Sequence, residues 1–99
     1  MSQFVVAEFH AAPGKLELLL ATLQQVLPDT RAYDGCLGLE SWLDKERSTI
    51  VLTEQWVSFD HYDRYLAWRG ETGALGAVAA LLDGGAAGFV PRKCGPAGC

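Results

Sequence analysis

The pattern of hydrophobic and polar residues predicts β-strands over residues 3–10, 36–44 and 48–56, where successive side chains fall on opposite faces of a sheet. The charged run Lys45-Glu46-Arg47 separates the second stretch from the third and suits a hairpin turn, so these two strands should pair antiparallel. The first stretch is apolar on both of its faces. A sheet built on it therefore needs cover on both sides, with helices on one side and the sheet of a second copy on the other.

Leucine and valine recur at helical spacing between Leu16 and Leu27, and polar residues fill the opposite side of this segment. This pattern predicts an amphipathic helix. Pro28 lacks the N–H that a helix interior uses, so we expect a kink there and a final turn that ends near Tyr33, before Asp34-Gly35.

A second helix should begin after Ser58, whose hydroxyl can accept a hydrogen bond from the first turn. One half of its helical wheel is polar, and the other half is rich in aromatic residues. The aromatic half contains Phe59, His61, Tyr62, Tyr65, Leu66, Trp68 and Arg69. Glycines at positions 70, 73 and 76 predict a break, followed by a short apolar helix and a last strand over residues 87–90 that Pro91 ends.

Strand, helix, two paired strands, helix and strand is the order of the ferredoxin-like split βαβ unit. This α+β fold places both helices on one face of a four-stranded antiparallel sheet. The opposite face would stay bare unless a second copy covered it, so a homodimer is expected. We assign residues 1–91 to this domain and residues 92–99, which contain Gly, Pro and Cys, to a C-terminal tail.

With 99 residues, of which 49% are hydrophobic, the chain can build one core and has no room for a second domain. Its net charge of -4 and the lack of a basic run argue against a nucleic-acid partner. No apolar stretch approaches the ~20 residues that cross a bilayer, and the N-terminus does not resemble a secretory signal, so a cytoplasmic location is expected. Three cysteines favour free thiols. Cys94 and Cys99 could form a disulfide or bind a metal, but we expect a flexible tail and no metal site.

Several turns and strand ends carry a resemblance to a known family. They lie in Val6-Ala7-Glu8, Pro13-Gly14, Asp34-Gly35-Cys36-Leu37-Gly38 and Ile50-Val51-Leu52-Thr53-Glu54-Gln55-Trp56, the last followed by Ser58. From about residue 4 to residue 90 the chain resembles the antibiotic biosynthesis monooxygenase family, which includes small quinol monooxygenases. The resemblance implies a dimeric α+β barrel. Tyr65 and Trp68-Arg69-Gly70 stand where many relatives have histidines, so roles assigned to those histidines do not transfer.

The chemistry that the resemblance implies can be matched to particular side chains. An electron-rich phenol or anthrone, once deprotonated, can pass an electron to O₂, so the protein must supply a base, anion stabilisation and a dry pocket, but no metal or cofactor. A histidine can exchange a proton near neutral pH, which makes His61 the candidate base. Arg69 and Trp56 complete the candidate catalytic set. The residues expected to bind the small aromatic substrate are Glu54, Tyr62, Tyr65 and Trp68.

Structural interpretations of the same residues stay open at this point. His61 could be a histidine at the edge of a helix, Arg69 could pair with Glu54, and the aromatic residues could belong to the core. Two other functions also stay open. One is haem binding or degradation with His61 as the axial ligand, and the other is binding or isomerisation of a small metabolite without oxygenation.

Overall fold

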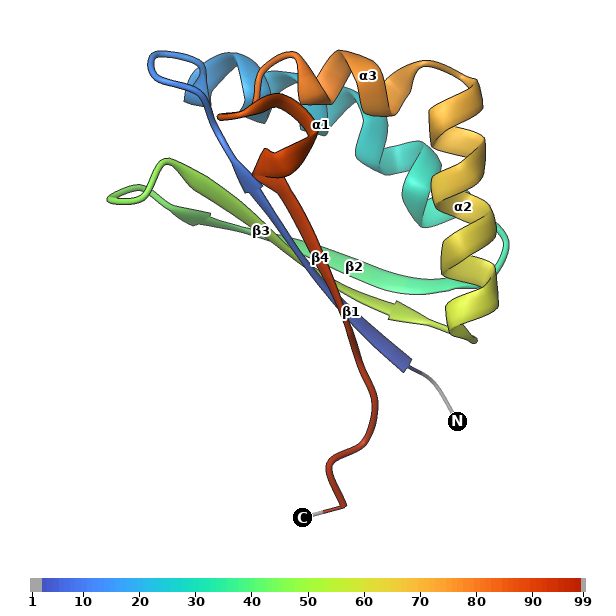
Figure 1. Ribbon diagram of the computed structural model, residues 1–99. Helices are drawn as coiled ribbons and strands as arrows, with labels where there is room; N and C mark the ends of the chain where they lie inside the picture. The colour runs from blue at the N-terminus through green and yellow to red at the C-terminus, as the bar shows by residue number, and fades with distance from the viewer. Residues whose placement is uncertain (1–2, 99) are drawn as a thin grey trace.

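Four antiparallel strands form one sheet in the order β2-β3-β1-β4. The computed structural model describes residues 3–98 and confirms the α+β ferredoxin-like fold, with all three helices on one face of the sheet (Figure 1). The elements in chain order are β1 (Gln3–His10), α1 (Leu16–Ala32), β2 (Cys36–Asp44), β3 (Thr49–Trp56), α2 (Phe59–Glu71), α3 (Ala74–Ala79), the 3₁₀ turn η1 (Gly85–Gly88) and β4 (Phe89–Cys94). Each helix of this part of the chain is too short or too polar to cross a lipid bilayer.

The two central strands, β1 and β3, form where the sequence predicts them, and each buries alternate residues. On β1 the buried residues are Val5, Ala7 and Phe9, and on β3 they include Leu52 and Glu54. The antiparallel register sets Val5 opposite Glu54, so this carboxyl lies on the apolar, helix-covered face of the sheet. A strand places alternate residues on one face whatever their polarity, which explains why a charged residue type enters the core here.

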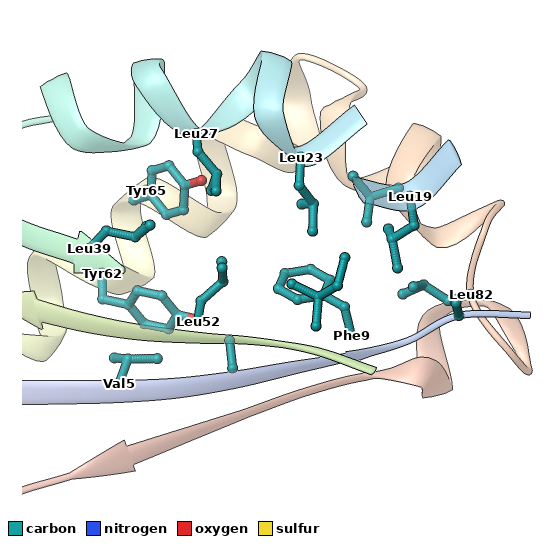
Figure 2. Close-up of a cluster of buried hydrophobic side chains, with 14 of the residues drawn as sticks. Val5, Phe9, Leu19, Leu23, Leu27, Leu39, Leu52, Tyr62, Tyr65 and Leu82 are labelled. Atoms are coloured by element: carbon teal, nitrogen blue, oxygen red, sulfur yellow. The ribbon is translucent and has the colours of Figure 1, made fainter. Parts of the chain in front are cut away.

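The core lies between this face of the sheet and α1. Figure 2 shows Leu19, Leu23 and Leu27 of α1 directed toward the sheet, at the four-residue spacing that keeps side chains on one side of a helix. The helix continues through Pro28 to Ala32, so the proline does not end it. Its end agrees with the predicted end near Tyr33.

The predicted start of α2 and the break after it are also confirmed. Ser58 Oγ accepts a hydrogen bond from the His61 backbone N–H at 3.2 Å and so caps the first turn of α2. The helix ends at Glu71, and Gly73 adopts a left-handed φ of 83° before α3 begins. Because a left-handed residue cannot continue a right-handed helix, the chain changes direction at Gly73.

The last strand differs from its prediction. Residues 85–88 form η1, and β4 begins at Phe89 and continues through Pro91 to Cys94 instead of ending at the proline. The reason is its position, because β4 is an edge strand that pairs only with β1 and sets Pro91 opposite Ala7. One side of an edge strand makes no hydrogen bonds within its sheet, so the N–H that proline lacks is not needed there.

Residues 92–94, which we expected in the tail, therefore extend the sheet. Neither Cys36 nor Cys94 forms a disulfide with another cysteine among residues 3–98. Cys99 lies outside the described residues, so the two alternatives for a Cys94 and Cys99 pair stay predictions.

Candidate active site

A cavity with about 430 Å³ of space between its atoms, part of it open to solvent, lies between the sheet and the three helices. Most of its wall is apolar, and four residues bring polar groups to it: Glu54 from β3, and Tyr62, Tyr65 and Arg69 from α2. The apolar wall consists of Phe9, Leu23, Val26, Leu27, Leu52, Leu66, Ala74, Leu75, Val78 and Phe89. All four polar residues were among those predicted for the site, and the structure brings them to one cavity.

Glu54 is the acidic group of this cavity. Its side chain is 3% exposed, and its hydrogen bond comes from Trp56 Nε1 to Oε1 at 2.9 Å. Burial disfavours the charged form and raises the pKa of Glu54 to about 7, although the hydrogen bond from Trp56 acts in the opposite direction. At neutral pH this carboxyl can therefore both take up and release a proton.

Tyr62 brings an unpaired hydroxyl to the same cavity. The side chain is buried, and its Oη has no hydrogen-bond partner among residues 3–98. Burial, together with the nearby Glu54 carboxylate, raises the pKa of Tyr62. Leaving a buried hydroxyl unpaired costs about 1–3 kcal/mol, so this oxygen is a natural partner for a polar atom of a ligand.

Arg69 is the cationic group and is 5% exposed. Its Nε donates to Tyr65 Oη at 2.9 Å, and its Nη2 donates to Thr30 Oγ1 at 2.9 Å and to the Val26 carbonyl. The hydroxyls of Thr30 and Tyr65 are also hydrogen-bonded to each other, at 2.5 Å. Among residues 3–98 Arg69 forms no ion pair, so the alternative in which it pairs with Glu54 is not observed.

The guanidinium of Arg69 therefore combines a fixed position with a free donor. Its centre lies 4.7 Å from the Trp68 ring centroid and 5.3 Å from that of Tyr65, within range of a cation–π contact. Nε and Nη2 make its hydrogen bonds, and Nη1 makes none within the described part of the chain. Nη1 is thus the donor that an anionic ligand atom could use.

Two predicted site residues, Trp56 and Trp68, do not line the cavity. Trp56 is fully buried behind Glu54, where its indole N–H orients the carboxyl. Trp68 packs against Tyr33 and the Arg69 guanidinium. Each of them thus contacts a residue of the cavity wall, Trp56 through Glu54 and Trp68 through Arg69.

His61 lies near the cavity but does not line it. Its Nδ1 is 2.7 Å from Ser58 Oγ, and its Nε2 is 3.9 Å from an Asp34 carboxylate oxygen. A Cβ atom at Gly35 would lie 2.5 Å from the histidine ring, so the ring packs directly on this glycine. These contacts fit a histidine that fastens the start of α2 to the turn before β2, and the catalytic role of His61 stays a prediction.

Thr30 and Tyr33 contact residues of the cavity wall and were not predicted from the sequence. Thr30 is buried at the Arg69 and Tyr65 contacts, and its position three residues after Leu27 continues the apolar side of α1, so helical spacing could have identified it. Tyr33 contacts Trp56, Tyr65 and Trp68, with ring centroids 5.2–6.5 Å apart. It follows the end of α1, where no periodicity applies, and only the folded chain brings it there.

A metal site would need several acidic, histidine or cysteine side chains placed close together. Within residues 3–98 no three of them are placed so that they could hold a metal ion.

The chain matches a known protein family over most of its length. The model of a family described as antibiotic biosynthesis monooxygenase matches residues 2–79. Curated proteins give no significant match.

Solved structures share the fold. A protein from Shewanella oneidensis is 23% identical, with a TM-score of 0.77 over 93% of this chain and 87% of that chain. A structure described as antibiotic biosynthesis monooxygenase is 18% identical, with a TM-score of 0.78 over 97% of this chain and 98% of that chain. A dimeric ferredoxin-like protein of unknown function from Jannaschia is 13% identical, with a TM-score of 0.70 over 97% of this chain and 100% of that chain. At these identities the similarity concerns the fold alone.

Proposed function

This chain belongs to the antibiotic biosynthesis monooxygenase family, and from that premise we propose that its cavity binds an electron-rich phenol or anthrone and supports oxygenation of the ring by O₂ without a cofactor. The observation that carries the proposal is the Glu54 carboxyl, 3% exposed in a mostly apolar wall. A base is most effective when its pKa lies near the working pH, and burial brings the pKa of Glu54 to about 7.

Glu54 takes the role of base in this proposal, in place of His61. Only Glu54 lines the cavity, whereas the His61 ring faces Ser58, Asp34 and Gly35. A base must reach the proton that it removes, so lining the cavity is the first requirement. The indole of Trp56 keeps the carboxyl oriented through its hydrogen bond.

Arg69 and Tyr62 supply the stabilisation of the anion. The phenolate that forms when Glu54 accepts the proton needs hydrogen-bond donors aimed at its oxygen. Arg69 Nη1 and Tyr62 Oη have no other partners within the described residues, and both residues line the cavity. Because the surrounding wall is apolar, these charge-assisted contacts are stronger than they would be in water.

The oxidation balances without a further reductant. Glu54 removes the phenol proton, and the phenolate gives one electron to O₂, which leaves an aryloxyl radical and superoxide. These combine through a C–O bond at a ring carbon conjugated with the oxygen, and the Glu54 proton converts the resulting peroxide to a hydroperoxide. Cleavage of the O–O bond, with loss of the C–H proton at that carbon, releases water and leaves a quinone. The substrate thus supplies all four electrons that reduce O₂.

Oxygen uptake tests this function directly. Purified protein should consume one O₂ for each quinone formed from 1-naphthol or anthrone, and with ¹⁸O₂ one labelled atom should appear in the quinone and the other in water. Uptake should persist after treatment with a metal chelator. Absence of turnover across such phenols would contradict the proposal.

Haem binding finds less support in this geometry. That hypothesis relied on His61 as the axial ligand, and His61 is not part of the cavity wall. We therefore retain oxygenation of a phenol as the function that the site supports best.

We also propose that two copies pair through the bare face of the sheet. This face, on the side away from the helices in Figure 1, exposes the large apolar side chains Phe4 at 49% and Trp42 at 55%. Val6 and Val51 lie on the same face and are half-buried. A two-fold axis would bring each of these side chains into the interface twice, and the Jannaschia protein of the same fold is described as dimeric.

Replacing Phe4 with Glu should weaken the dimer. Burial of one phenylalanine contributes about 1.5–3 kcal/mol, and a two-fold interface loses two of them, so the dissociation constant should rise by about a hundredfold or more. Sedimentation velocity across a concentration series measures this change. Leu18→Glu is the matched control, because Leu18 is equally exposed but lies on α1, on the other side of the molecule. A monomeric native protein, or equal effects of the two variants, would contradict the dimer.

A further inference from the structure

A second cavity adjoins the one that holds Glu54 and Arg69. It has about 320 Å³ of space between its atoms, part of it open to solvent. Seven side chains form its wall, six of them from β1, α3, η1 and β4 and the seventh, Leu82, from the segment after α3. None of the seven carries a polar group, and the helix and turn contribute small residues, Ala79 and Ala86. This space suits an apolar group and would reject a charged or hydrogen-bonding one, since a polar group buried there would find no partner.

The two cavities share part of their walls. Phe9, Leu75, Val78 and Phe89 line both of them. Phe9 and Phe89 pack against each other with ring centroids 4.9 Å apart. The polar groups of the first cavity come from β3 and α2, whereas the second cavity extends away from them toward α3 and η1. Together the two spaces have one polar end and one apolar end.

We propose that the substrate of this protein is a phenol that carries an apolar chain on its ring, with the phenol oxygen at Glu54 and Arg69 and the chain in the second cavity. This inference rests on the proposed function for the position of the phenol. A ring without a substituent, held in the first cavity, would leave the apolar wall of the second one without contacts. An alkyl or isoprenoid chain would cover that wall and bury its own surface.

The chain should strengthen binding step by step. Burial of one methylene contributes an amount that corresponds to about a fourfold gain in affinity, and less where the cavity is open to solvent. Isothermal titration calorimetry under argon, which prevents oxidation, can compare 1-naphthol with its 2-ethyl, 2-butyl and 2-hexyl derivatives. We expect the dissociation constant to fall by about twofold to fourfold per added methylene until the second cavity is filled.

Filling the second cavity from the protein side should remove this gain. Ala79 is half-buried and lines the second cavity but not the first. Ala79→Phe should therefore weaken binding of the hexyl derivative by about tenfold or more and change binding of 1-naphthol by less than about twofold. Ala77→Phe is the matched control, because Ala77 lies on the same helix, is exposed and lines neither cavity.

A second variant covers the case in which Ala79→Phe disturbs folding. Ala86 in η1 lines the same cavity from another element and is exposed, so Ala86→Phe fills the space with little overpacking. Its control is Ala87→Phe, at an exposed position next to it that lines neither cavity. Affinity that does not depend on chain length in the native protein would overturn the proposal. So would equal weakening of 1-naphthol and the hexyl derivative in both cavity variants.

Oxygen uptake separates this inference from the function on which it rests. Chain-dependent binding without O₂ uptake would contradict oxygenation and leave the apolar subsite standing. Turnover of 1-naphthol with no preference for the alkylated compounds in binding would support oxygenation and overturn the subsite.

Discussion

Glu54→Gln is expected to lower kcat for phenol oxygenation by about a hundredfold to ten-thousandfold, the usual contribution of a positioned general base. An amide cannot accept the phenol proton, but its oxygen can still accept the hydrogen bond that Trp56 Nε1 donates to Glu54. The loss of kcat should therefore come from the missing proton acceptor more than from a displaced side chain. Stopped-flow or oxygen-electrode rates at saturating 1-naphthol measure it.

The pH dependence gives this prediction a second readout. Only the ionised carboxylate can act as a base, so kcat/KM of the native protein should rise with pH through about 7, where Glu54 loses its proton. In Glu54→Gln this rise of kcat/KM with pH should be absent. Glu40→Gln, which changes an exposed glutamate on β2, is the control. It should keep both the native kcat and the rise of kcat/KM with pH. If kcat/KM of Glu54→Gln rose with pH as it does in the native protein, the base would be another group.

The stability of the fold should decrease over the pH range in which kcat/KM increases, because both depend on the ionisation of Glu54. The pKa of Glu54 is about 7 in the folded chain against 4.5 for the ordinary group, so the folded state binds this proton more tightly than the unfolded state does. As pH rises from about 4.5 to about 7, the folded state should lose about 3 kcal/mol of stability through this group. Urea unfolding at several pH values should show that loss in the native protein and not in Glu54→Gln.

Arg69→Met is expected to lower kcat/KM by about a hundredfold to a thousandfold, because it removes the cation that would face the phenolate. Methionine is unbranched and apolar, so it can occupy much of the space of the arginine stem. The Thr30 and Tyr65 hydroxyls keep their mutual hydrogen bond, which limits the expected loss of stability to about 1–2 kcal/mol. Binding of 1-naphthol should weaken most above the pH at which the bound phenol ionises.

Arg64→Met is the matched control for this prediction. Arg64 lies on the exposed side of α2, and its contact is with the backbone carbonyl of Asp60. The control should bind and turn over 1-naphthol at nearly the native rate. If Arg69→Met retained native kcat/KM and pH dependence while it lost stability, Arg69 would be a structural residue only.

Local patterns in the sequence were sufficient for the framework of this protein. Strands β1 and β3 form where the sequence predicted them, and the two-residue period of a strand sets Glu54 and Trp56 on the same face of β3. Ser58 predicted the start of α2, and the glycines that follow predicted the end of this helix. These features depend on the period of a strand or helix and on single-residue conformations, which neighbouring residues decide.

Pro91 shows where local rules stop. A proline in an apolar run predicts the end of a strand, yet β4 continues through it because the strand lies at the edge of the sheet. Position within the sheet is a property of the whole fold, and only the tertiary structure could reveal it.

The candidate active site also has a part that local patterns predicted and a part that only the tertiary structure decided. The helical wheel of α2 correctly gathered its apolar half, with His61 at the edge of that half. A wheel contains no information on where along the sheet each turn of the helix lies. The packing of α2 decided that Tyr62 and Arg69 line a cavity while His61 lies on Gly35. The bond from Arg69 to Thr30 joins residues 39 positions apart, and no local pattern can register a contact over that separation. The sequence by itself thus determined which side chains enter the core, and the tertiary structure decided which of them meet.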